Sequence, residues 1–119
     1  MAATTTVGSG KYTYEVDEEW AKLPEGWEMP AAAVYGDSKD RVFCFNRDPE
    51  HPVCIFDREG NFISSWGAGL ISFAHAIYLD KDDNVWLVDR NKHQVFKFTV
   101  DGKLLLTIGE EGFRSDTGV

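Results

Sequence analysis

The chain has 119 residues, of which 43% are hydrophobic and 13% aromatic, and its formal net charge is −8. This length and composition are typical of one globular domain with a modest core. The acidic balance argues against nucleic-acid binding, because phosphates are bound by clustered Lys and Arg. No apolar run approaches the roughly 20 residues of a membrane span. We therefore expect neither a nucleic-acid nor a membrane partner.

The first ten residues carry small and polar side chains. They have neither the basic start nor the apolar stretch of a secretory signal peptide. We therefore expect residues 1–10 to be a disordered leader and residues 11–119 to form a single domain. With no signal peptide and with cysteines that we expect to be reduced, the sequence favours a cytoplasmic location.

The segment before the main body of the domain divides into a strand and a connector. Residues 11–17 alternate in character, which predicts a strand. Residues 18–30 are rich in turn-forming residues and contain Trp20 and Trp27. We expect these two indole rings to pin the connector to the rest of the domain.

Most of the remaining chain is an internal repeat. Residues 33–47 recur at 76–90, and the similarity then continues from His51 and His93 onward. The identical pairs are Ala33/Ala76, Tyr35/Tyr78, Asp37/Asp80, Asp40/Asp83, Val42/Val85, Arg47/Arg90, His51/His93, Val53/Val95, Phe56/Phe98, Gly60/Gly102 and Gly67/Gly109. A repeat of about 40 residues built from strands and turns is typical of β-propeller blades.

Each copy divides into four short strands separated by turn residues. The predicted strands are 31–36, 41–46, 52–57 and 61–66 in the first copy, and 74–79, 84–89, 93–98 and 103–108 in the second. We therefore predict an all-β fold with two four-stranded antiparallel blades, over about residues 30–67 and 72–109. The strand at residues 11–17 is expected to close the fold as an edge strand added to a blade of the same chain or of a neighbouring copy.

Several inner strands are apolar at successive positions, which indicates sheets that are covered on both faces. The repeat predicts a core of equivalent residues. These are Val34/Ile77, Val42/Val85, Phe43/Trp86, Val53/Val95, Phe56/Phe98 and Phe62/Leu104. Two blades alone would leave apolar sheet faces in water, so we expect a partial propeller that is completed by homo-oligomerisation.

Two cysteines, Cys44 and Cys54, lie in the middle of neighbouring predicted strands. We favour buried reduced thiols, with a cross-strand disulfide as the alternative. The acidic turns Asp37–Asp40 and Asp80–Asp83 lack the spacing of a known calcium-binding loop. Hairpin turn chemistry explains these turns better.

Candidate functional residues are weighed by comparing the two copies. His75 begins the inner strand of the second blade, and its equivalent in the first blade is Ala32, so this histidine is not a packing feature of the repeat. One imidazole does not make a zinc site, so His75 is a channel-lining residue or, in an assembly, a metal ligand. His51 and His93 are equivalents, which favours a local role in the preceding turn.

Arg47 and Arg90 are also repeat equivalents. A structural role in bonding loop carbonyls is therefore weighed against a functional role for Arg47. The sequence contains no Gly-x-Ser-x-Gly elbow, Cys-x-x-Cys pair, P-loop or His-Glu-x-x-His motif, so no nucleophile with a neighbouring base is identified.

The repeats resemble the NHL-repeat family of six-bladed β-propellers and, within it, the peptidyl-α-hydroxyglycine α-amidating lyases. The resemblance covers roughly residues 11–117, which correspond to the first two blades. It rests on Val34, Asp37-Ser-Lys, Val42-Phe-Cys-Phe-Asn-Arg47, Phe73-Ala-His75, His93-Gln-Val-Phe-Lys-Phe98 and Leu104-Leu-Leu-Thr-Ile-Gly109.

This resemblance implies an active-site role for Arg47 and a zinc-ligand role for His75. It also implies that the backbone carbonyls of Val34 and Ile77 contact a structural calcium ion, so zinc and calcium are the implied cofactors. The other two zinc histidines, the catalytic tyrosine and the other four blades of the family have no counterpart in these 119 residues. Tyr35 and Tyr78 lie near the expected channel, but neither matches the catalytic position.

The resemblance also suggests the form of the assembly. Three copies of two blades make six, and threefold symmetry would bring three His75 residues to the axis. A trimeric ring is therefore the favoured oligomer, and a dimer that packs open blade faces together is its rival.

Three functions follow. The first is a non-catalytic NHL-type interaction module that acts as an oligomer, with an unknown small-molecule or peptide ligand. The second is a metal-dependent, lyase-like enzyme assembled in the channel of an oligomeric ring, in which Arg47 stabilises developing negative charge. The third is a truncated gene fragment without its own activity.

Overall fold

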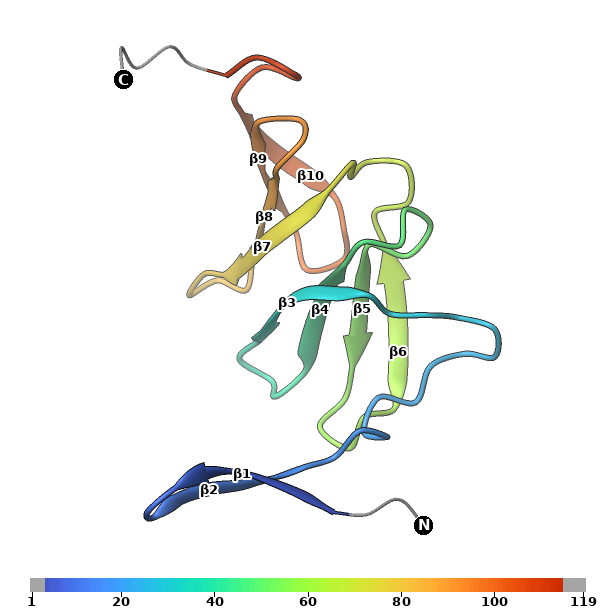
Figure 1. Cartoon of the computed structure of the whole chain (residues 1–119). Coiled ribbons are helices and arrows are strands. Elements are labelled where there is room, and N and C mark those ends of the chain that lie inside the picture. Colours follow the sequence, from blue (N-terminus) through green and yellow to red (C-terminus); the bar gives the residue numbers. More distant parts are fainter. Residues whose placement is uncertain (1–3, 115–119) are drawn as a thin grey trace.

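The computed structural model describes residues 4–114, and all regular structure among them is β (Figure 1). This confirms the all-β prediction. Within that range no helix is long and apolar enough to cross a membrane. Residues 1–3 of the predicted leader and residues 115–119 of the predicted domain lie outside the described residues.

Two four-stranded antiparallel sheets form the main body, and we call them blade one and blade two. Blade one runs in the order β3 (Ala31–Gly36), β4 (Val42–Asn46), β5 (Val53–Phe56) and β6 (Phe62–Trp66). Blade two runs in the order β7 (Ala74–Leu79), β8 (Val85–Asp89), β9 (Gln94–Phe98) and β10 (Leu104–Ile108). All eight strands agree with the predicted ranges to within one residue at each end.

The hairpins share one turn device. Asp80 Oδ1 accepts hydrogen bonds from the backbone N–H groups of Asp82 and Asn84, at 2.9 and 3.0 Å. The Oδ1 atoms of Asp37 and Asp57 accept in the same way from the backbone N–H groups two and four residues later in the chain. The carboxylates therefore replace a backbone turn, as Asp side chains do, and the prediction that these are structural turns is confirmed.

The main core lies between the two blades, because alternate side chains of each sheet point toward the other. Phe43 and Phe45 of β4 and Val53 of β5 are fully buried on the side of blade one that faces blade two. From blade two, the facing residues are Ile77, Leu79, Val85, Leu87, Phe96 and Phe98. Blade one thus covers one face of blade two.

The opposite face of blade one, which carries Cys44, Cys54 and Phe56, is called its front face. It is covered by the connector, and these three side chains are at most 3% exposed. The connector residues packed there are Trp20, Ala21, Leu23, Trp27 and Met29. The expectation that two blades alone leave apolar faces of both sheets in water is therefore corrected: most of the front face of blade one is covered within the chain.

Two tryptophans cover the blades in the same way. Trp66 donates its Nε1 hydrogen to the carbonyl oxygen of Val100 at 3.1 Å, and its ring lies 5.0 Å from that of Phe98. Trp20 donates to the carbonyl oxygen of Arg58 at 3.3 Å, and its ring lies 5.7 Å from that of Phe56. Since Phe56 and Phe98 are repeat equivalents, Trp20 contacts blade one as Trp66 contacts blade two.

Of the twelve predicted core residues, six are buried, four are half-buried and two are exposed. Val34 is 60% exposed and Leu104 is 49% exposed. Four further predicted core residues are half-buried, namely Val42, Phe62, Trp86 and Val95. The reason is local coverage: the connector does not reach Val34, and Leu104 lies on the outermost strand of blade two.

The N-terminal residues form a hairpin of their own. The sequence predicted a disordered leader over residues 1–10, whereas the structure places residues 5–9 in β1 (Thr5–Ser9). This strand pairs with β2 (Tyr12–Val16), so the strand predicted at 11–17 exists but adds to neither blade of its own chain. Figure 1 shows this hairpin apart from the two blades.

We predict that Phe98→Ala lowers the free energy of unfolding by about 3–5 kcal/mol, because a fully buried aromatic ring leaves a cavity between the blades. Its register partner Leu104 is half exposed, so Leu104→Ala should cost less than about 1 kcal/mol. Urea unfolding followed by tryptophan fluorescence measures both. Equal losses in the two variants would contradict the placement of the core.

Candidate functional site

The candidate site lies where the end of β4 meets the start of β7. Arg47 directly follows β4, and its Nε donates a hydrogen bond to the carbonyl oxygen of Ala74 at 3.2 Å. Ala74 immediately precedes His75 on β7, and the inner strands β3 and β7 lie side by side. Of the two residues that sequence resemblance had singled out, Arg47 thus bonds the carbonyl of the residue that precedes the other, His75.

A phenylalanine lies between two arginines at this edge. The guanidinium carbon of Arg47 is 4.1 Å from the ring centre of Phe73, and that of Arg90 is 5.2 Å away. Cation–π contacts of this kind hold guanidinium groups over an aromatic face. The backbone N–H of Arg90 donates to the Phe73 carbonyl at 3.0 Å, as that of Arg47 donates to Pro30 at 3.1 Å. The Arg47 side chain thus bonds a carbonyl of β7, whereas the Arg90 side chain contacts the Phe73 ring, and the choice between a structural and a functional role for Arg47 stays a prediction.

The position of Phe73 is fixed by a buried carboxylate. Asp89 is 1% exposed and accepts backbone hydrogen bonds from Ser72 and Phe73, at 2.7 and 3.2 Å. It also accepts from Asn91 and Lys92, at 3.0 and 3.1 Å. Asp89 was not among the residues predicted from the sequence. The sequence feature that could have identified it is a polar residue at the end of an apolar strand, at the position that Asn46 occupies in blade one.

His75 itself is exposed and borders a shallow pocket of about 290 Å³ on blade two. Arg90 and His93 also line this pocket. Among residues 4–114, no three His, Cys, Asp or Glu side chains lie close enough together to hold a metal ion. A zinc ion needs three or four ligands, so the residues of one chain do not fit zinc, and any zinc site at His75 would draw on other chains or blades.

The two carbonyls implied for calcium lie on neighbouring inner strands. Val34 is on β3 and Ile77 is at the equivalent place on β7. Calcium takes six to eight oxygen ligands, and the described part of the chain contributes no carboxylate cluster beside them. Calcium binding by these two carbonyls therefore stays a prediction from resemblance.

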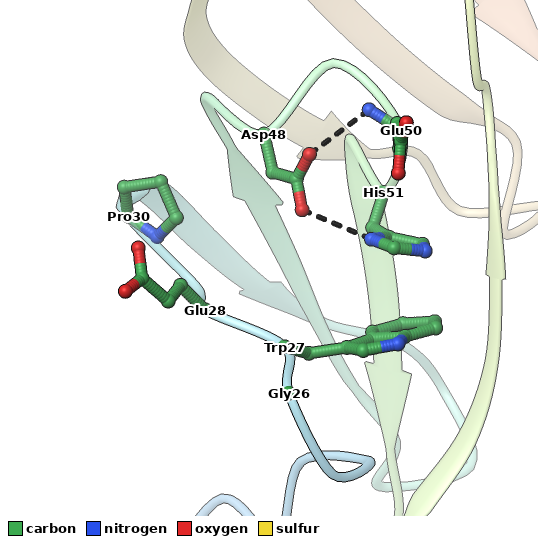
Figure 2. Close-up of a pocket in the computed structure, with 7 residues that line it drawn as sticks. All are labelled: Gly26, Trp27, Glu28, Pro30, Asp48, Glu50 and His51. Atoms are coloured by element: carbon green, nitrogen blue, oxygen red, sulfur yellow. Dashed lines mark hydrogen bonds and ion pairs between the residues drawn. The ribbon is translucent and has the colours of Figure 1, made fainter.

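A second pocket, of about 460 Å³, lies beside the connector (Figure 2). The Trp27 ring stacks on His51 with centroids 3.4 Å apart, and His51 Nδ1 lies 2.9 Å from Asp48 Oδ2. The hydrogen bond with His51 lowers the pKa of Asp48. This confirms the predicted local role of His51 in the preceding turn. Glu28 and Glu50 give the rest of the pocket an acidic lining.

The two cysteines face each other in register across β4 and β5 as free, buried thiols. Desolvation by burial, with a smaller contribution from Cys54, raises the pKa of Cys44 to about 11. Burial also raises the pKa of Cys54. The favoured interpretation, buried reduced thiols, is confirmed, and the disulfide alternative is wrong.

Comparison with known proteins gives two similar sequences. The chain is 46% identical over 48 residues to peptidyl-alpha-hydroxyglycine alpha-amidating lyase 1 of Drosophila melanogaster, a match that covers 38% of this chain and 9% of that protein. It is 31% identical over 72 residues to the probable amidating lyase pgal-1 of Caenorhabditis elegans, covering 56% of this chain and 21% of that protein. No family model matches the chain.

These matches support part of the resemblance. The chain is similar to proteins named as amidating lyases, and its four-stranded antiparallel sheets are consistent with propeller blades. The aligned regions span between about a tenth and a fifth of the length of those relatives. The activity of the whole relatives is therefore a matter for proposal.

We predict that neither cysteine reacts with N-ethylmaleimide in the native protein at pH 8, because burial and a raised pKa keep the thiolate population low. Both should react once the protein is unfolded in urea, and mass spectrometry counts the adducts. A Ser9→Cys variant, with its added thiol on the exposed strand β1, is the control that should label at once. Rapid native labelling of Cys44 or Cys54 would contradict the covered front face.

Proposed function

We propose that this chain is a non-catalytic propeller interaction module that acts as a homo-oligomer. The observation that carries the proposal is the outer face of blade two, defined by Trp86, Val88, Val95 and Lys97. These residues are only half-buried, although their equivalents in blade one are the core residues Phe43, Phe45, Val53 and Ile55. Blade two therefore presents the kind of surface that a further blade covers.

The exposed apolar surface extends beyond this face. Ile108 at the end of β10 is 51% exposed and Phe113 is 63% exposed. Their equivalents, Trp66 and Ile71, pack against or within the core between the blades. Contiguous apolar patches on soluble proteins are typical of interaction sites, so the favoured partner is another copy that supplies a blade.

The assembly has two forms to be distinguished. Three copies joined head to tail would give six blades, and a closed rotation would make a ring with no end. A dimer would cover only the two outer faces of blade two. The trimer is the favoured form because the family that the repeats resemble has six blades.

We predict that light scattering at micromolar concentration reports three times the 13.4 kDa mass of one chain. Burial of the outer face of blade two drives this association. A mass of two chains would overturn the ring while leaving the oligomer. A monomer would overturn the module as proposed here and favour a gene fragment without its own activity.

A second candidate is a lyase-like enzyme assembled in the channel of the ring. The specific observation in its favour is that Arg47 and His75 share one edge, bridged by the hydrogen bond from Arg47 to Ala74. The similar proteins are named as lyases that act on peptidyl-α-hydroxyglycine. In such an assembly His75 would be one ligand among several, and Arg47 would stabilise developing negative charge.

For this second candidate we predict that the oligomer takes up zinc and loses it in His75→Ala. His51→Gln is the matched control, because His51 is occupied by Asp48 and Trp27 and should leave the metal content unchanged. Metal analysis of the purified oligomer provides the measurement. An oligomer with the same metal content in wild type and His75→Ala would overturn the enzyme candidate and leave the interaction module.

A further inference from the structure

The contact between the two blades of one chain is a template for the way in which two copies of the chain would pack together. We propose that the outer face of blade two binds blade one of a second copy head to tail, with Lys81 of one copy paired to Asp40 of the next. This inference rests on the proposed homo-oligomer and assigns its interface.

The template for this pair is a contact between the two β-turns that follow the inner strands. Asp83, in the turn between β7 and β8, accepts a hydrogen bond from the Ser38 backbone N–H at 3.1 Å and another from the Ser38 hydroxyl. Ser38 lies in the corresponding turn between β3 and β4. This contact links blade one to blade two at the ends of their inner strands.

The repeat places a complementary pair in the corresponding turns of the two blades, on residues that the contact between the blades does not use. The equivalent of Asp83 is Asp40, which is exposed and has nearly the same backbone conformation, with φ of 61° against 60°. The equivalent of Ser38 is Lys81, whose side chain is 87% exposed and whose Nζ lies 3.1 Å from the carboxylate of the neighbouring Asp82. A second copy docked as blade one docks on blade two would bring Lys81 to Asp40, a cation to an anion.

The apolar surfaces correspond in the same way. Ile77 of blade two is 8% exposed beneath blade one, whereas its equivalent Val34 is 60% exposed on the front face of blade one. Val34 is thus the part of the front face that the connector leaves open. The outer face of blade two, with Trp86 and Val88, is the repeat image of the surface that covers Ile77.

The connector occupies the site on blade one that corresponds to the Trp66 site on blade two. Trp20 already packs on Phe56 and donates to Arg58. In a docked copy, the residue equivalent to Trp66 would be Ile108, which is smaller and has no side-chain N–H to donate. The chain therefore fills this site from its own connector and leaves Val34 on the innermost strand β3 as the exposed part of the front face for the partner.

Charge reversal tests the pair. Lys81→Asp should weaken association about tenfold, because it sets two carboxylates against each other at every interface. Asp40→Lys should do the same, and the double variant Asp40→Lys/Lys81→Asp should associate as the wild type does. Lys103→Asp, which makes the same change of charge in the exposed turn between β9 and β10, is the control. Sedimentation equilibrium gives the dissociation constants, and thermal melting confirms that each variant folds.

A cross-link supplies an independent measurement. Copies of Lys81→Cys mixed with copies of Asp40→Cys should form a disulfide between chains on mild oxidation, since the native cysteines are buried. A face-to-face dimer of blade two would keep the same dissociation constant in the charge-reversal variants and would form no such cross-link. This result would overturn the proposed interface but not the proposed oligomer. A monomeric wild-type protein would overturn both the interface and the oligomer. The outer face of blade two would then be covered by blades from outside these 119 residues.

Discussion

The structure depends on the need to cover both faces of each sheet. Strands such as β4 carry apolar side chains at successive positions, so a blade in isolation would expose one set whichever way it faced. Blade one meets this need from two directions: Phe43 and Phe45 pack on blade two, and Cys44 packs under the connector. Blade two has a cover on one side only. Because the outer face of blade two has no such cover within the described residues, we infer that the protein assembles with another copy.

The connector shows how a short segment substitutes for a blade. Trp20 makes the same two contacts with blade one that Trp66 makes with blade two, a ring packed on a phenylalanine and an N–H donated to a turn carbonyl. Glycine in the turn permits this approach. A Cβ on Gly102 would lie 2.6 Å from the Trp66 ring, and one on Gly60 would lie 1.8 Å from the Trp20 carbonyl oxygen. Both turns therefore require glycine.

The edge that carries Arg47 and His75 is built by the same packing. Asp89 ties down the segment that enters β7, which places Phe73 between two guanidinium groups and sets the Ala74 carbonyl beside Arg47. These contacts explain a structural role for both arginines. They also leave His75 exposed at the end of an inner strand, where residues from other blades would meet in a closed ring.

By itself, the sequence determined the eight blade strands, the aspartate turns and the equivalence of the two blades, because alternation and turn chemistry act over a few residues. Only the tertiary structure decided which equivalent residues are buried. Val34 and Ile77 hold the same position in their blades, yet one is 60% exposed and the other 8%. The N-terminal hairpin is local, and its first strand was missed because the small and polar residues of β1 show no apolar alternation. The carboxylate of Asp89 escaped prediction for a related reason, since its donors Ser72 and Phe73 lie 17 and 16 residues earlier in the chain. Coverage of a sheet face, and the partners of a buried charge, are set by segments distant in the chain.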